Sequence, residues 1–312
     1  MTLRANLRNR PVIYEVVPPR KDVSRFHTEP RGLEEVFHDG RIAAINIPEL
    51  INRREEGGKV NYSPATIPPE EYALAIAEYV EPIVNLIAPR LPKEDFLRRA
   101  RRILNDYSIP NLIVVGKESQ DDFLPGPTVT EALKMLNSER GSDVAFGGIC
   151  IFDRESKGPH DYGVRSGHLE EHERIWLKGQ AGCNFVTSQV TFNSEPAVRF
   201  FSQYQEFCKQ KKTEPLTVFI SLSTVPSPSI LKLLENLDVQ IPPRVKKDLL
   251  SSNNMARESV KVATEVFLEI ITKLDLLGIE VPLGLQIEQI GVNNDRLSLE
   301  LLDEVFPEFR AG

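Results

Sequence analysis

The sequence predicts a single (β/α)₈ barrel that spans all 312 residues. Eight short apolar segments alternate with longer amphipathic segments every ~30–40 residues, which is the rhythm of parallel strands joined by crossover helices. Most of these segments are apolar at consecutive positions, as strands buried on both faces are. Eight such units in one chain favour a closed barrel over an open sheet, and no change of composition or Gly/Ser-rich linker marks a second domain.

The expected strands are rich in β-branched residues and follow this repeat along the chain. They cover residues 12–17, 43–47, 82–88, 111–115, 144–151, 184–192, 216–222 and 284–290. Helices are predicted where apolar residues recur every three or four positions, most clearly over 93–107, 129–136 and 256–277. The long interval before the last strand leaves room for one more short helix, over 242–250.

Two connections are too long for simple turns, residues 49–69 after the second strand and residues 152–165 after the fifth. Both leave the C-terminal ends of strands, the face of a (β/α)₈ barrel that carries its chemistry. We therefore expect both at the mouth of the barrel, either as parts of a site or as surface connections with no role in one.

Composition and charge exclude several classes of protein. The chain has 38 Lys+Arg against 45 Asp+Glu, and this net charge of −7 argues against a nucleic-acid or membrane-surface binder, whose footprint would be basic. No apolar run approaches the ~18 residues of a membrane helix, and no N-terminal apolar core indicates a signal peptide. Three cysteines, Cys150, Cys183 and Cys208, are too far apart for a disulfide framework. We expect a cytoplasmic protein.

Some short patterns carry little weight. Residues 168–172, His-Leu-Glu-Glu-His, match the pattern of inverted zinc peptidases, but no distant acidic ligand accompanies them. We interpret this segment as an acidic helix start, and the cysteines as small core residues. The chain has no glycine-rich dinucleotide loop and no Walker loop, so a nicotinamide or flavin would have to lie in the barrel mouth.

Glu15 is the first informative residue, because it lies inside an otherwise apolar strand. A carboxylate there must point into the barrel mouth or be paired, since burying it alone is costly. Desolvation would raise its pKa, which suits a general acid that works near neutral pH. The alternative is a structural carboxylate paired with a neighbouring Lys or Arg.

Further polar residues interrupt or close the other strands. They are Asn46, Asn85, Glu118, Gln189, Gln286 and Glu288. Amide and carboxylate groups at barrel strand ends can bind a heterocycle that has both donors and acceptors. The alternative is a polar layer inside the barrel whose members bond only to one another.

These segments resemble the methylenetetrahydrofolate reductase family over nearly the whole chain. Residues 14–19, Tyr-Glu-Val-Val-Pro-Pro, are similar to the family's Phe-Glu-Phe-Phe-Pro-Pro at the end of its first strand. Residues 180–183, Gln-Ala-Gly-Cys, and 188–193, Ser-Gln-Val-Thr-Phe-Asn, resemble its Asp-Ala-Gly-Ala turn and Thr-Gln-Phe-Phe-Phe-Asp strand. Val-Gln-Ile-Pro at 239–242 resembles its Val-Arg-Ile-Pro, and Gly-Val-Asn-Asn at 291–294 resembles its Thr-Leu-Asn-Arg.

The resemblance implies a barrel that reduces 5,10-methylenetetrahydrofolate to 5-methyltetrahydrofolate with reducing equivalents from NAD(P)H, normally relayed by FAD. It implies that Glu15 is the general acid, which protonates N10 of the substrate. It assigns Gln189 and Asn293 to the pterin. Glu118 falls where the family has an aspartate between flavin and pterin, and it keeps the charge on a longer side chain.

The positions that the resemblance assigns to the flavin are Asn46, Asn85, Lys117 and Lys178. Only Lys178 agrees with the family, which has threonine at the first position and histidine at the second. Its Arg-Gly pair is Gly-Lys at 116–117. These departures leave two hypotheses: FAD is held through other residues, or NAD(P)H is used directly or with a different flavin arrangement.

The sequence thus predicts a reductase of a folate-like one-carbon carrier, with FAD and NAD(P)H as cofactors and a reduced pterin as substrate. We expect a homo-oligomer or a complex with other proteins of one-carbon metabolism. One alternative is a non-redox pterin-binding barrel that serves as a transfer partner or regulatory subunit, and another is an unrelated lyase or aldolase that uses Lys117. Because folates and dinucleotides are anionic, basic residues should gather at the mouth. The candidates are Arg20, Lys117, Arg154 and Lys178.

Overall fold

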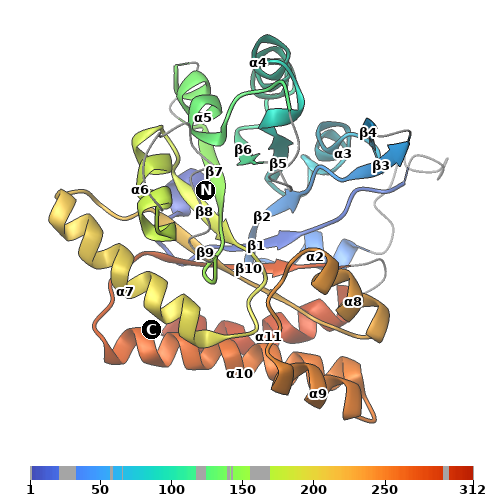
Figure 1. Cartoon of the computed structure of the whole chain (residues 1–312), viewed down its shortest axis with the longest axis vertical. Coiled ribbons are helices and arrows are strands. Elements are labelled where there is room, and N and C mark those ends of the chain that lie inside the picture. The colour runs from blue at the N-terminus through green and yellow to red at the C-terminus, as the bar shows by residue number, and fades with distance from the viewer. Residues whose placement is uncertain are drawn as a thin grey trace.

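The structure is a computed structural model that describes residues 2–20, 33–56, 59–64, 66–116, 124–138, 141, 143–154, 169–290 and 295–311, with only the backbone between 52 and 64. Eight parallel strands close into a barrel in the order β1-β10-β9-β8-β7-β6-β5-β2, which confirms the predicted fold class (Figure 1). Their bounds are β1 Val12–Glu15, β2 Ile42–Ile47, β5 Pro82–Ile87, β6 Asn111–Val115, β7 Ala145–Cys150, β8 Phe185–Ser188, β9 Thr217–Ser223 and β10 Leu283–Glu288.

Helices follow the strands and surround the barrel (Figure 1). They are α1 Leu3–Asn6, α2 Glu34–Phe37, α3 Pro69–Ile76, η1 Ala88–Arg90, α4 Lys93–Arg101, α5 Val129–Asn137, α6 Glu171–Gln180, α7 Ser194–Lys211, α8 Pro228–Asn236, α9 Pro243–Ser251, α10 Met255–Leu276 and α11 Asp295–Ala311. The short helix expected over 242–250 is α9. The helix expected over 93–107 is α-helical only as far as Arg101 and continues as the π-helical turn η2, Arg102–Asp106.

Strand β8 is shorter than expected, because it ends at Ser188 and not at residue 192. Single backbone bonds continue beyond it, from Gln189 to the Cys150 carbonyl and from Thr191 to the Ser221 carbonyl. The chain then turns into α7, whose first turn is capped by the side chain of Asn193. The strand ends because Asn193, two residues after Thr191, already caps the helix.

The inside of the barrel has an apolar end, which lies at the N-terminal ends of the strands. Alternate residues of a strand face the inside, and the residues between them face the helices. The inward-facing apolar cluster consists of Ile13, Ala44, Ile83, Ile113, Ala145, Phe185 and Phe219. Leu3 of α1 and Leu7 complete the cluster, and the Thr217 hydroxyl donates to the Leu7 carbonyl at 2.8 Å. The N-terminal segment therefore closes this end.

Two glycines make room for the aromatic rings of that cluster. A Cβ at Gly147 would lie 2.6 Å from the Phe185 ring, and one at Gly284 would lie 2.4 Å from the Phe219 ring. The two rings meet edge to face with their centroids 5.5 Å apart. Glycine at these two strand positions thus lets both rings lie inside a narrow barrel.

The outward-facing strand residues form a second, larger cluster with the surrounding helices, in which Tyr14 and Ile287 meet Phe201 and Phe267. The three cysteines are buried and form no disulfide, which confirms their interpretation as core residues. In the described part of the chain, no helix is long and apolar enough to cross a membrane.

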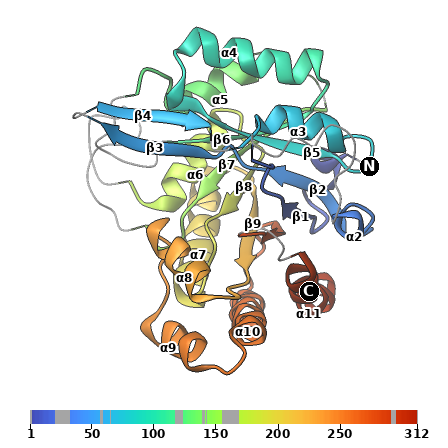
Figure 2. The same ribbon diagram turned by 90° about the vertical axis from the view of Figure 1, so that its right-hand side faces the viewer.

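The connection 49–69 was expected to be a loop, but it contains an antiparallel hairpin. Strand β3, Ile51–Glu56, pairs with β4, Lys59–Pro64, and the two form a sheet of their own. The hairpin extends from the end of the barrel opposite to the N-terminus (Figure 2). This position agrees with the prediction that the segment lies at the mouth.

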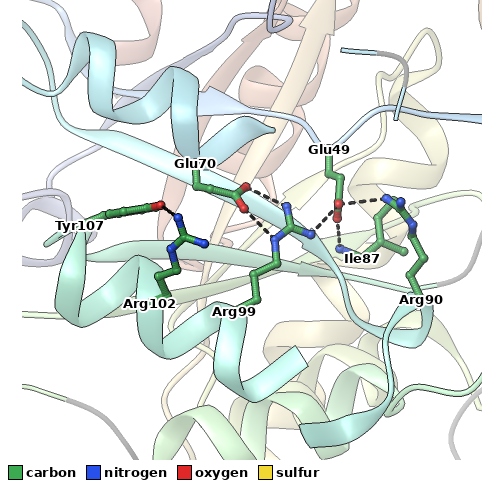
Figure 3. A network of polar contacts seen from close by, with 7 residues as sticks. All are labelled: Glu49, Glu70, Ile87, Arg90, Arg99, Arg102 and Tyr107. Atoms are coloured by element: carbon green, nitrogen blue, oxygen red, sulfur yellow. Dashed lines mark hydrogen bonds and ion pairs between the residues drawn. The ribbon is translucent and has the colours of Figure 1, made fainter. Parts of the chain in front are cut away.

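A buried ionic network fixes the base of this hairpin (Figure 3). Glu49 accepts from the Ile87 backbone nitrogen at 2.9 Å, from Arg90 at 3.0 Å and from Arg99 at 2.6 Å. Arg99 also makes a two-pronged contact with Glu70, at 2.9 and 2.7 Å. The network joins the residues after β2 to β5, α3 and α4, so the hairpin begins from a fixed point.

Candidate functional site

Polar side chains line the inside of the barrel beyond the apolar cluster, toward the C-terminal ends of the strands. The alternation along each strand places them two positions beyond members of that cluster or, on β10, two and four positions beyond Gly284. They are Glu15, Asn46, Asn85, Thr187, Ser221, Gln286 and Glu288. A barrel that is apolar at its closed end and polar at its mouth is suited to a small polar ligand.

Glu15 is the last residue of β1 and lies between Asn46 of β2 and Glu288 of β10, both of which pair with it in register. Its Oε2 accepts a hydrogen bond from the Asn46 amide nitrogen at 2.8 Å. Burial and the neighbouring Glu288 raise the pKa of Glu15 well above its ordinary value, against a smaller lowering by Asn46. The pKa of Glu15 is thus shifted in the direction that a general acid requires.

Glu288 is a second carboxyl group with an unusual pKa. Burial raises the pKa of Glu288 to about 7, although a hydrogen bond from the Gln286 amide lowers it. The Gln286 amide nitrogen donates to Glu288 Oε1 at 3.0 Å. Sequence reasoning noted Glu288 among the polar strand residues but gave it no role, because its proximity to Glu15 depends on the closure of the barrel between β1 and β10.

Four buried amide oxygens inside the barrel have no hydrogen-bond partner among the residues that the structure describes. Three lie toward the mouth, on Asn46, Asn85 and Gln286, and the fourth is that of Asn111 at the start of β6. A buried acceptor without a partner costs about 1–3 kcal/mol. The polar layer is thus not satisfied by its own members alone, and its free acceptors match a ligand that carries several N–H donors.

The structure brings together some of the predicted site residues. Glu15 and Asn46 are hydrogen-bonded, and Asn85 lies on β5, the strand next to β2. Gln189 lies just beyond β8 at the rim, where its amide nitrogen donates to the Leu237 carbonyl at the end of α8 (2.8 Å). Glu118, Asn293 and Lys117 lie outside the described residues.

Lys178 lies apart from this group, in the wall between α6 and β7. Its ammonium group donates to the Ile149 carbonyl of β7, and the residue is only 3% exposed. Its side chain also packs against the strand, because a Cβ at Gly148 would lie 3.3 Å from Lys178 Cδ. The family resemblance that made Lys178 a candidate does not show which face of the helix meets the strand.

Of the four residues that were assigned to a flavin, the structure describes Asn46, Asn85 and Lys178 but not Lys117. The pyrophosphate of FAD requires cationic or N–H donors. The amide nitrogen of Asn46 is used by Glu15, and Lys178 is enclosed between helix and strand. Asn85 is the remaining candidate among the described residues, and it is neutral.

Two of the other basic residues that were expected to gather at the mouth are described. The backbone of Arg20 forms an isolated bridge with Thr66, a short distance along the chain from β4. Arg154 lies beside Glu171 at the start of α6, with 3.4 Å between Nε and Oε2. Lys117 lies outside the described residues, so the gathering of basic residues stays a prediction.

The segment 168–172 begins a helix, as interpreted from the sequence. Glu170 and Glu173 form a capping box at the start of α6, and the ring of His172 packs against Phe207. His168 lies outside the described residues. Among those that are described, no three His, Cys, Asp or Glu side chains form a group that could hold a metal ion.

Comparisons with known proteins give a fold. Neither a protein-family model nor a curated protein matches the sequence. Among solved structures, an uncharacterised protein from Clostridium thermocellum that binds two copies of 5-methyl-5,6,7,8-tetrahydrofolic acid is 20% identical, with a TM-score of 0.72 over 97% of this chain and 98% of that one. A chitinase from Bacteroides thetaiotaomicron is 12% identical, with a TM-score of 0.48 over 96% of each chain, and carries no argument. The first likeness establishes that the two chains share the barrel fold.

Proposed function

We propose that the polar mouth of the barrel binds a reduced folate and that Glu15 protonates it, so that 5,10-methylenetetrahydrofolate is reduced to its 5-methyl form by NAD(P)H. The observation that carries the proposal is a buried carboxyl group of raised pKa that lies among buried amide oxygens without partners in the described part of the chain. The resemblance of the segments around Glu15 and Gln189 to the reductase family supports the same substrate.

The hydrogen-bonding groups of the site complement those of a reduced pterin. The pterin ring presents an amino group and ring N–H groups as donors, together with a carbonyl oxygen and ring nitrogens as acceptors. The amide oxygens of Asn46, Asn85 and Gln286 would accept from the donors. Glu15, in its protonated state, would donate to a ring or bridge nitrogen.

The reaction requires one proton and one hydride. Glu15 would give its proton to N10, the bond between N10 and the bridging methylene would break with its electron pair left on N10, and the lone pair of N5 would form an iminium. A hydride from NAD(P)H would add to the iminium carbon, which gives the methyl group and NAD(P)⁺. Glu15 would then recover a proton from water. General acid catalysis of this kind contributes about 10²–10⁴-fold.

The solved structure with the same fold adds support for the ligand class. That protein binds 5-methyltetrahydrofolate, the product of the proposed reaction, and it aligns with nearly the whole of this chain. Because the two chains are 20% identical, the ligand of that protein indicates which ligand to test here. The proposal itself rests on the side chains around Glu15.

We propose that NAD(P)H supplies the hydride, either directly or through FAD that is bound by residues other than those assigned to it. A visible absorption spectrum of the purified protein tests this point. A flavin band would contradict direct transfer and show that FAD is bound through other residues.

The reductase proposal is tested by the oxidation of NADH and of NADPH with 5,10-methylenetetrahydrofolate, with and without added FAD. We expect oxidation that depends on the folate and 5-methyltetrahydrofolate as the product. No folate-dependent oxidation under any of these conditions would contradict the reductase activity.

One observation favours a second candidate function, a pterin-binding barrel without redox activity. The described residues of the inner polar layer are acids, amides and hydroxyls, with no cation for the pyrophosphate of a dinucleotide. Such a protein would serve as a one-carbon transfer partner or a regulatory subunit. Folate binding without NAD(P)H oxidation would select it.

A further inference from the structure

We infer that Glu15 and Glu288 share a single proton at neutral pH and act as a pair, in which Glu288 keeps the proton on Glu15. Glu288 is thus a positioning residue, since it acts on the substrate through Glu15. This inference deepens the proposed function, and only the transfer of the proton to the substrate rests on that function. The shared proton is a property of the protein without substrate.

The first support is the register of the strands. Glu15 pairs with Glu288 across β1 and β10, and both side chains are on the inner face of the barrel. Adjacent strands lie about 4.8 Å apart, so paired residues on the same face are immediate neighbours. Two carboxylates so close and partly removed from water repel each other strongly, and one of them remains protonated to a higher pH.

The second support is the surroundings of the two carboxyl groups. Each accepts one amide hydrogen bond, Glu288 from Gln286 at 3.0 Å and Glu15 from Asn46 at 2.8 Å. The Ser221 hydroxyl donates to the Ser188 carbonyl at 2.7 Å, so its proton is not available to Glu288. The charge of Glu288 raises the pKa of Glu15 beyond the effect of burial, so the proton lies on Glu15 and the charge on Glu288.

The third support is the absence of a neutralising cation in the described surroundings. On one side of the pair, β2 and β5 contribute Asn46 and Asn85, which are neutral. On the other side, β9 contributes Ser221 and Ser223, which are also neutral. Beyond β10, Asp295 at the start of α11 is bonded by Gln289 and adds no positive charge. No described group therefore offsets the repulsion within the pair.

The pair has a consequence for the proposed reaction. An isolated glutamic acid would be ionised at neutral pH and would have no proton to give. Glu288 keeps Glu15 protonated until the substrate nitrogen takes the proton. After the transfer two adjacent carboxylates remain, and their repulsion favours the uptake of one proton from water, which restores the starting state.

The test is a pH titration of the free protein by infrared difference spectroscopy, which detects the carbonyl stretch of a protonated carboxylic acid. The proteins compared are the wild type, Glu15→Gln, Glu288→Gln, and Glu78→Gln as a control from the exposed surface. We expect the wild type and the control to keep a protonated carboxyl group up to about pH 7.

The two site variants should differ in the titration of the residue that remains. In Glu288→Gln the midpoint of Glu15 should fall by at least about one pH unit, because the repelling charge is gone. In Glu15→Gln the midpoint of Glu288 should stay near that of the wild type, because Glu288 already titrates beside a neutral Glu15 and its pKa is raised by burial. Glu288→Asp, which restores the charge, should return the midpoint of Glu15 toward that of the wild type, as loss of a merely structural contact would not.

Two outcomes would overturn the shared proton. One is the loss of the protonated band below about pH 5.5 in the wild type, where ordinary glutamates are already ionised. The other is a Glu288→Gln protein in which Glu15 titrates as in the wild type. Neither outcome involves a folate, so a protein that shows the pair but does not bind 5-methyltetrahydrofolate would contradict only the proposed function.

Discussion

At the scale of single residues, the proposed chemistry rests on Glu15, whose pKa is raised by burial and by the neighbouring Glu288. Replacement by the neutral, similarly shaped amide in Glu15→Gln keeps the hydrogen-bonding shape but removes the proton. We expect the rate of methylenetetrahydrofolate reduction to fall by about 10²–10⁴-fold with the fold retained. Steady-state kinetics and circular dichroism measure the two effects, with Glu78→Gln as the matched control. A fully active Glu15→Gln would show that Glu15 is not the acid.

Glu288 should make the stability of the protein depend on pH. The pKa of Glu288 is raised from 4.5 to about 7 in the folded state, so its contribution is complete below pH 4.5 and is lost as the pH rises through 7. Between about pH 5 and pH 8, the free energy of unfolding should fall less in Glu288→Gln than in the wild type. The difference should be about 1–3 kcal/mol, since one pKa unit corresponds to about 1.4 kcal/mol. The free energy of unfolding is measured by urea denaturation at both pH values. An equal fall in Glu288→Gln and in the wild type would contradict the raised pKa.

At the scale of elements, the network around Glu49 should decide how firmly the base of the hairpin is held. Arg99→Met keeps much of the side-chain volume but leaves Glu49 and Glu70 without a shared cation. We expect it to lower the free energy of unfolding by about 3–5 kcal/mol, as breaking a buried pair does.

The control for this change is Arg98→Met, one residue earlier on α4. Arg98 contacts Asp95 at 2.5 Å, but its side chain is 76% exposed, so its loss should cost at most about 1 kcal/mol. Chemical denaturation of both variants gives the comparison. Equal losses would mean that the network around Glu49 is no stronger than a surface ion pair.

The strand β10 should tolerate no side chain at Gly284. In Gly284→Ala the new methyl group would overlap the ring of Phe219, which is itself packed against Phe185. We expect a loss of about 1–3 kcal/mol in thermal or chemical unfolding. Gly40→Ala is the matched control, because no atom lies within 4 Å of the added group, and its effect should stay within about 0.5 kcal/mol. A Gly284→Ala protein as stable as the control would contradict the packing inside the barrel.

At the scale of the whole molecule, the sequence contains enough to predict the barrel, because eight apolar runs at a regular spacing leave few other folds. It does not reveal the hairpin β3–β4, whose polar residues at 52–56 show no alternation of apolar and polar positions. It indicates Glu15, since a lone carboxyl group in an apolar run requires an explanation. The pairing of Glu15 with Glu288 depends on which strands meet when the barrel closes, and the place of Lys178 depends on which face of α6 meets β7. Neither is written in local sequence.

The central claim is that the inner polar layer binds a reduced folate. Its most direct test is the dissociation constant of 5-methyltetrahydrofolate, measured by titration calorimetry at about pH 7. The two proteins compared are the wild type and Asn85→Leu. The amide oxygen of Asn85 has no partner among the described residues, so its removal should leave the free energy of unfolding unchanged or raise it. The same removal takes an acceptor from the ligand. We predict that the wild type binds and that Asn85→Leu binds at least about tenfold more weakly, as the loss of one buried hydrogen bond implies. A wild type that does not bind, or a variant that binds as tightly as the wild type, would contradict it.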